Sequence, residues 1–294
     1  MGIKFRLIVM NFLQYAIWGS WLISLGAYLG GGLDFTGLQI GSFFATMGVA
    51  SLFMPAVMGI IADRWIPAQK LLGICHLVSG GFLIAAASQT AYGPLYSCML
   101  LSVMFYMPTI ALSNSVAYNA LDLARLDTVK HFPPIRVWGT VGFIAAMWFV
   151  DLTHIGGVQI KLTEWQLYVS AVLSFLLAVY SFSLPGCPVD RNVKARSWVD
   201  TLGLRAFTLF KEKRMAIFFV FSMLLGAALQ ITNAFGDSYI QSFGSMPQYA
   251  DSAIVKHSVI LLSLSQMSET FCILLIPFFL RRFGIKKVML ISML

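Results

Sequence analysis

Long apolar segments alternate with short polar stretches along most of this chain. A helix that crosses a bilayer needs about 20 mainly apolar residues. Eight segments meet this requirement, and the pattern therefore predicts an all-α integral membrane protein. The predicted spans cover residues 7–29, 37–61, 70–88, 95–118, 135–151, 165–185, 215–239 and 253–280.

A shorter apolar stretch, VMLISML, follows Lys287 at the end of the sequence. It is too short to cross a membrane, and a chain that stops there leaves backbone carbonyls unpaired in lipid. We expect it to be the start of a ninth span, and the sequence to be a piece of a longer protein.

Composition supports a membrane location and excludes other classes. Apolar residues make up 59% of the chain and charged residues 11%, against about 45–50% and 25% in soluble domains. The net charge of +8 is not a nucleic-acid signal, because the basic residues lie at the ends of apolar runs. The four cysteines are far apart, and no nucleotide-binding or metalloprotease motif is present, so we expect no metal or cofactor.

The distribution of Lys and Arg predicts the orientation. If the N-terminus is cytoplasmic, nearly all of these residues fall on the cytoplasmic side, and Lys161 and Lys256 fall outside, as the positive-inside rule requires. The longest polar stretch is basic and follows six spans, the plan of a six-plus-six transporter. The predicted parts are an N-terminal six-helix bundle (1–185), a cytoplasmic linker (186–214) and a partial C-terminal bundle (215–294).

Two late spans carry polar pairs at membrane depth. Gln230 and Asn233 are three residues apart, as are Gln266 and Glu269, so each pair shares a helical face. A single amide is most simply explained by a hydrogen bond between helices. The same spacing in two helices favours a polar cavity instead, and Glu269 is the clearest carboxylate at that depth.

The fifth span carries a third polar stripe. Arg136, Thr140 and Phe143 follow one helical face. From the residues alone, an interfacial cation whose side chain reaches toward water is the leading explanation of Arg136. The combined set of amides, hydroxyls, rings, one acid and one guanidinium suits a neutral, hydroxyl-rich solute with a planar ring. Amides and rings serve a sugar or a nucleoside equally well.

A short motif lies between the second and third spans. Gly59-Ile-Ile-Ala-Asp63-Arg64 resembles the GxxxD-[RK] signature of major facilitator transporters, in which the Asp pairs across the cytoplasmic face and holds one state of the gate. The later part of that signature is absent here. An ordinary turn with an interfacial ion pair explains the motif about as well.

Longer segments carry a more specific resemblance. FPPIRVWGT and MLLGAALQITN, together with FLQYAIWGSWLISLGAYL and SQMSETFCILLIPFFLRRFGIKKVMLIS, resemble the bacterial nucleoside:proton symporter family of the major facilitator superfamily. This resemblance covers essentially the whole chain. It implies a twelve-helix transporter, of which eight spans and the start of a ninth are present.

The resemblance also implies a substrate site between two halves. Its motifs place substrate contacts on the residues selected above by depth and spacing, and they reverse the interfacial explanation of Arg136. These residues are Arg136, Thr140, Phe143, Gln230, Asn233, Gln266 and Glu269. Glu269 is also the candidate for proton coupling, and Gly59, Asp63 and Arg64 are candidates for the cytoplasmic gate.

The implied function is proton-coupled import of nucleosides across the bacterial inner membrane, by a monomer with a nucleoside and a proton as its partners. A sugar:proton symporter of the same superfamily is the main alternative. A membrane enzyme or a sensor is disfavoured, because the four histidines are scattered and no soluble signalling domain is present.

Overall fold

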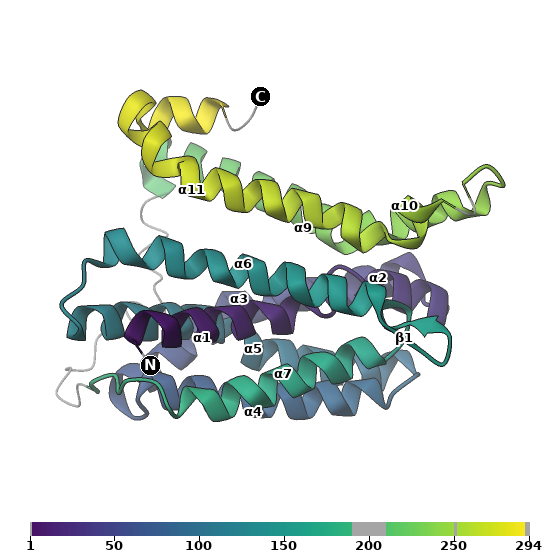
Figure 1. The fold of residues 1–294 in the computed structure, drawn as a ribbon, viewed down its shortest axis with the longest axis horizontal. Coiled ribbons are helices and arrows are strands. Elements are labelled where there is room, and N and C mark those ends of the chain that lie inside the picture. Colours follow the sequence, from purple (N-terminus) through teal and green to yellow (C-terminus); the bar gives the residue numbers. More distant parts are fainter. Residues whose placement is uncertain (1, 190–209, 250–251, 292–294) are drawn as a thin grey trace.

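The structure, a computed structural model, describes residues 2–189, 210–249 and 252–291. Its long helices run roughly parallel or antiparallel to one another (Figure 1). We call one end of this array the hairpin end, because the hairpin of β1 and β2 lies there, and the other the linker end, where α7 ends and α9 begins. The elements are α1 (Ile3–Gly19), α2 (Leu25–Ala27), the π-helix η1 (Tyr28–Gly32), α3 (Gly37–Arg64), α4 (Ala68–Ala87), α5 (Tyr92–Leu123), α6 (Thr128–Leu152), β1 (His154–Ile155), β2 (Val158–Gln159), η2 (Ile160–Leu162), α7 (Trp165–Ser181), α9 (Lys213–Ser242), η4 (Phe243–Ser245), α10 (Ala253–Lys256) and α11 (Ser258–Ile291).

Each predicted span corresponds to helical structure. By length and apolar composition, 5 helices in the described part of the chain are able to cross a membrane: α3, α4, α5, α6 from Lys130, and α9 extended to Ser245. Helix α7 is apolar but has 17 residues. Most of the predicted linker, residues 190–209, lies outside the described part of the chain.

The first predicted span, residues 7–29, is helical in separate parts. Helix α1 ends at Gly19, and an irregular turn leads into α2 and η1. A Cβ at Gly19 would overlap the backbone of Phe143 on α6, so α1 and α6 approach closely at this glycine. Next to it, the Ser20 hydroxyl donates to the Ala16 carbonyl, a local bond that competes with the helix.

The predicted eighth span, 253–280, is also interrupted. Its first residues form the short α10, and the helix is interrupted at His257 before α11 begins. Inside α11, Gly284 has φ 72°, a left-handed conformation that favours glycine. The last helical residues follow this break, where the start of a ninth helix was expected.

Glycines bring α1 and α6 into backbone contact. A Cβ at Gly142 would overlap the carbonyl of Phe12, and a Cβ at Gly139 would meet the ring of Tyr15. Small residues three apart on one face let two membrane helices approach closely and gain dispersion energy. The WGTVGF segment therefore fixes α6 against α1.

Buried polar side chains inside the N-terminal helices bond to one another. Gln14 donates to Thr109 at 2.7 Å, and its amide oxygen lies 2.8 Å from a ring nitrogen of His76. The Tyr106 hydroxyl donates to the Gln14 carbonyl. These bonds join α1, α4 and α5, so here a buried amide serves helix packing, the simpler of the two explanations.

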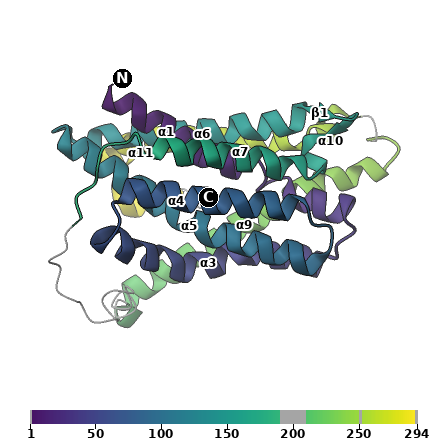
Figure 2. The same cartoon turned by 90° about the horizontal axis from the view of Figure 1, so that it is seen from below.

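Helices α9 and α11 form a second layer over the N-terminal group, by which we mean α1 to α7 (Figures 1 and 2). The two layers meet toward the hairpin end. There Gly26 lies against the carbonyl of Ala234 on α9, and Trp148 on α6 donates to Ser263 on α11 at 2.8 Å.

A buried ionic network ties the layers together at this end. Asp151, at the end of α6, is 0% exposed and pairs with the Lys161 ammonium at 2.5 Å. Its second oxygen lies 2.7 Å from Nδ1 of His257. Lys161 also donates to the Lys256 carbonyl at 2.9 Å and to Ser258 at 3.3 Å, so one ammonium joins both layers.

The network continues onto α9 through Asp237. The Ser258 hydroxyl donates a short hydrogen bond to one oxygen of this carboxylate, and Gln241 donates to the other at 2.9 Å. Asp237 is 0% exposed. Every carboxylate in the network therefore has partners, the condition under which buried charge is tolerated.

The glycine contact gives a testable expectation. Gly142→Ala should lower stability by about 1–3 kcal/mol, since the added methyl group forces α1 and α6 apart. The expected readout is a lower midpoint of thermal unfolding in detergent. Gly81→Ala is the control, because a Cβ at Gly81 meets nothing within 4 Å. Equal midpoints for the two variants would show that the close approach does not contribute to stability.

Candidate functional site

A cavity of about 750 Å³ lies between α9 and the N-terminal group. Helices α1, α3 and α5 form one wall and α9 the other. Its lining is mostly apolar and small, which leaves room for a solute. The lining residues are Trp18, Gly41, Phe44, Ala45, Met47, Gly48, Ser51, Met107, Gly226, Ala227, Gln230, Ile231, Ala234 and Phe235.

Two hydrogen-bond donors in this lining have no partner among the described residues. They are the indole nitrogen of Trp18 and the amide nitrogen of Gln230, and both atoms are buried. A buried donor without a partner costs about 1–3 kcal/mol. The two side chains that carry them lie on opposite walls of the cavity.

Trp18, which lines this cavity, belongs to a group of packed aromatic rings. Trp18 contacts Phe143 edge-on at 6.3 Å between ring centroids and Tyr106 at 5.9 Å. The Arg136 guanidinium lies over the Tyr15 ring, 3.8 Å from its centroid. This contact holds the cation inward on α1, so Arg136 is not the freely hydrated interfacial cation that the residues alone suggested.

The seven predicted site residues occupy different environments. Gln230 lines the cavity. Thr140 and Phe143 are buried, at 7% and 6% exposure, against the neighbouring helices. Asn233 and Gln266 are half-buried and Glu269 is exposed.

The gate motif lies at the linker end of α3. Asp63 is exposed and Arg64 half-buried. A Cβ at Gly59 would meet nothing within 4 Å, so no helix packs closely on this glycine in the described part of the chain.

Sequence reasoning missed Trp18 as a site residue. Its ring packs against the rings of Tyr106 and Phe143, as an aromatic residue in an apolar span is expected to do. Only the fold reveals that Trp18 lines a cavity and that its buried Nε1 has no partner among the described residues. The ionic network was missed as well, since Asp151 and His257 are separated by 106 positions.

Comparison with known proteins agrees with this architecture. The whole chain, residues 1–294, matches the family described as nucleoside H+ symporter. It is 53% identical to a xanthosine permease of Escherichia coli (strain K12) over 293 residues, covering 100% of this chain and 69% of that protein. It is 48% identical to the nucleoside permease NupG of the same organism over 292 residues, covering 99% and 69%.

Solved structures give the same result. A crystal structure of the nucleoside transporter NupG, as its D323A mutant, superposes with a TM-score of 0.90 at 47% identity, covering 99% of this chain and 71% of that one. A second NupG structure gives a TM-score of 0.86 at 48% identity, with the same coverage.

Long apolar helices around a cavity are typical of a polytopic membrane protein such as a transporter. The family match and the relatives make this specific, and the chain belongs to the nucleoside H+ symporter family. It is a transporter and not an enzyme. The sugar symporter considered above is therefore set aside.

The cavity predicts a labelling pattern. In a variant without the native cysteines, Ser51→Cys should react with a water-soluble thiol reagent, because Ser51 lines the cavity and is exposed. Ser79→Cys should react far more slowly, since Ser79 is buried against Ser102 at 2.9 Å. Similar labelling rates, followed by mass spectrometry, would contradict the assignment of the cavity.

Proposed function

We propose that this protein imports nucleosides together with protons across the bacterial inner membrane, as a monomer and by alternating access. Residues 1–185 and 215–294 would rock as two halves around a fixed site, with 186–214 as the cytoplasmic linker. The family match and relatives named as nucleoside and xanthosine permeases support this proposal. Twelve helices in a six-plus-six arrangement are the expected complete form.

The observation that carries the proposal is the pair of unpartnered donors in the cavity. A nucleobase presents ring nitrogens and carbonyl oxygens as acceptors around a flat ring, and a ribose adds hydroxyls. Trp18 and Gln230 would donate to such acceptors from opposite walls. Both donors are already desolvated, so ligand binding does not have to remove water from them. A ligand without acceptors leaves them unpaired.

The other predicted residues complete the site in this proposal. Phe143 stacks on the base, and Asn233 and Gln266 bond the ribose and the base edge. Arg136 orients the substrate or holds an acid. Glu269 carries the coupling proton.

The conformation fits one state of the cycle. The ionic network and the contacts of α9 with α2 and of α11 with α6 gather at the hairpin end. If the linker end faces the cytoplasm, this is a form closed toward the outside. In the opposite state Asp63 of the gate motif would find a partner across the linker end.

Substitutions at the two donors test the substrate site. Trp18→Phe keeps the ring but removes the donor, and Gln230→Leu keeps the volume. Each should raise the KM for nucleoside uptake by about 3–30-fold, the loss of one buried hydrogen bond. Thr232→Val is the matched control, because the exposed Thr232 bonds only the Ala228 carbonyl of its own helix.

The readout is uptake of labelled uridine and adenosine into cells that express the complete gene, with competition by unlabelled nucleosides and by sugars. Unchanged KM values in both donor variants would refute the site. Competition by sugars as strong as by nucleosides would refute the substrate class.

Glu269→Gln tests the coupling group. The variant keeps the shape and hydrogen-bonding capacity of the side chain but cannot titrate. Proton-driven accumulation of nucleoside should fall at least about tenfold, while equilibrium exchange, which needs no net proton transfer, should fall far less. Glu212→Gln, at an exposed carboxylate beside α9, is the control. Accumulation at the wild-type rate by Glu269→Gln would show that another acid couples the proton.

A further inference from the structure

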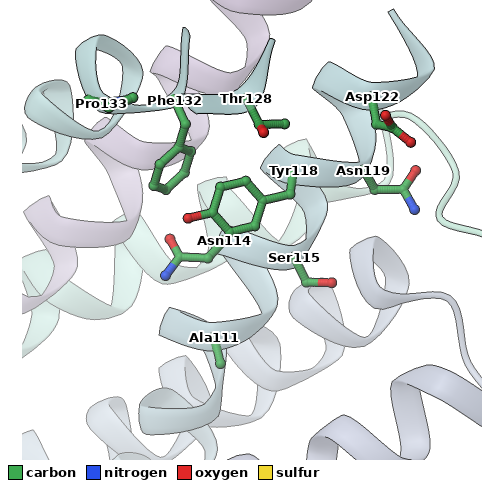
Figure 3. A pocket seen from close by; sticks show the side chains of 9 residues that line it. All are labelled: Ala111, Asn114, Ser115, Tyr118, Asn119, Asp122, Thr128, Phe132 and Pro133. Atoms are coloured by element: carbon green, nitrogen blue, oxygen red, sulfur yellow. The ribbon is translucent and has the colours of Figure 1, made fainter. Parts of the chain in front are cut away.

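A second pocket lies at the linker end, between α5 and α6. Its volume is about 1050 Å³, larger than that of the central cavity. Figure 3 shows the Tyr118 ring near its middle, with Phe132 and Asn114 beside it and Asn119 and Asp122 further along α5. The remaining lining residues are Ala111, Ser115, Thr128 and Pro133.

The pocket combines rings with an unsatisfied polar group. The rings of Tyr118 and Phe132 are 4.4 Å apart, and Tyr118 is 46% exposed. The amide oxygen of Asn114 is buried and accepts no hydrogen bond from any described residue. The pocket therefore offers a flat stacking surface beside an amide that needs a partner.

One helical face connects this pocket to the central cavity. On α5, Ala111, Asn114 and Tyr118 continue the face of Met107, and Met107 lines the central cavity. Asn114 is seven residues from Met107, about 10 Å along the helix axis. The same face of α5 thus runs from one pocket to the other.

The charge of the lining favours a neutral ligand over an anionic one. Asp122 is the one charged residue among the nine that line the pocket. A phosphorylated solute would be repelled by this carboxylate and would find no cation in the lining. A neutral solute with a vicinal diol would be bonded by it, since a carboxylate accepts two hydroxyl hydrogen bonds. Rings, amides and an acid together suit an unphosphorylated nucleoside.

We propose that the pocket between α5 and α6 is a second nucleoside-binding station, which the substrate occupies on its way between the central cavity and the linker end. The base stacks on Tyr118, Asn114 bonds the base edge, and Asp122 accepts the ribose hydroxyls. This inference rests on the proposed nucleoside transport and adds a residue set that the central site does not contain.

A station near one end predicts an asymmetry between the two faces of the membrane. Tyr118→Leu should raise the KM for nucleoside presented at the linker end about tenfold, the loss of one base–aromatic stack. The KM for nucleoside presented at the hairpin end should stay within about twofold, because binding from that side begins at the central cavity. Tyr118→Phe keeps the ring and should behave as wild type.

The experiment measures uptake of labelled uridine and adenosine by right-side-out and inside-out vesicles that contain the complete transporter. Phe53→Leu is the control, because it removes an exposed ring on α3, 57% exposed. Gln230→Leu should raise both KM values, which separates the central site from the station. Asn114→Ala gives an independent variant and should raise the linker-end KM alone.

Each outcome decides one claim. A rise in KM at the linker end alone, in Tyr118→Leu and Asn114→Ala, supports the station. If the KM in Tyr118→Leu and Asn114→Ala changes equally at both ends, or at neither end, the station is refuted. Nucleoside transport is not refuted by that result. A wild-type protein without saturable flux of either uridine or adenosine overturns the proposed function and the station together.

Discussion

The buried ion pair between Asp151 and Lys161 constrains the rest of the structure. Both side chains are at most 1% exposed, and breaking such a pair on one side typically costs about 3–5 kcal/mol, because it leaves a desolvated charge. Lys161 also bonds the chain just before α11 and, through Ser258, connects to Asp237 on α9. Closing the hairpin end therefore requires α6, α9 and α11 to meet at one place.

The ionic network joins the two layers at the hairpin end, and away from that end the layers are less tightly connected. Within the N-terminal group, α1 and α6 touch through glycines, and α1, α4 and α5 share the Gln14 bonds. These close and polar contacts tie α1, α4, α5 and α6 to one another. Toward α9 and α11 the contacts are fewer, and the central cavity lies between the layers. A rigid group and a separable layer are what rocking about a site requires.

Much of the fold follows from the sequence, because apolar length alone identifies a span in a bilayer. The seventh span, expected at 215–239, is α9 at Lys213–Ser242. The break after Gly19 was not expected, and nothing in the local sequence marks this glycine as the place where α1 meets Phe143. The polar pair on α9 was selected by spacing, and spacing does not reveal that Gln230 rather than Asn233 lines the cavity. The ring of Trp18 packs against neighbouring rings, and the lack of a described partner for its Nε1 is a property of the assembled helices.

The polar residues near the linker end of α5 have two explanations in the sequence: a position at the membrane–water interface, and a role in a binding site. Asn114 and Tyr118 lie where a membrane helix meets polar headgroups, so their presence needs no special cause. Their surroundings in the structure are not explained by a position at the headgroups alone. A headgroup-facing amide is hydrated, whereas the Asn114 oxygen is buried without a described partner, and a headgroup-facing tyrosine needs no second ring 4.4 Å away. Because the same α5 face leads to Met107 in the central cavity, these groups lie along one route, where a solute leaving the centre meets rings and amides before it reaches water.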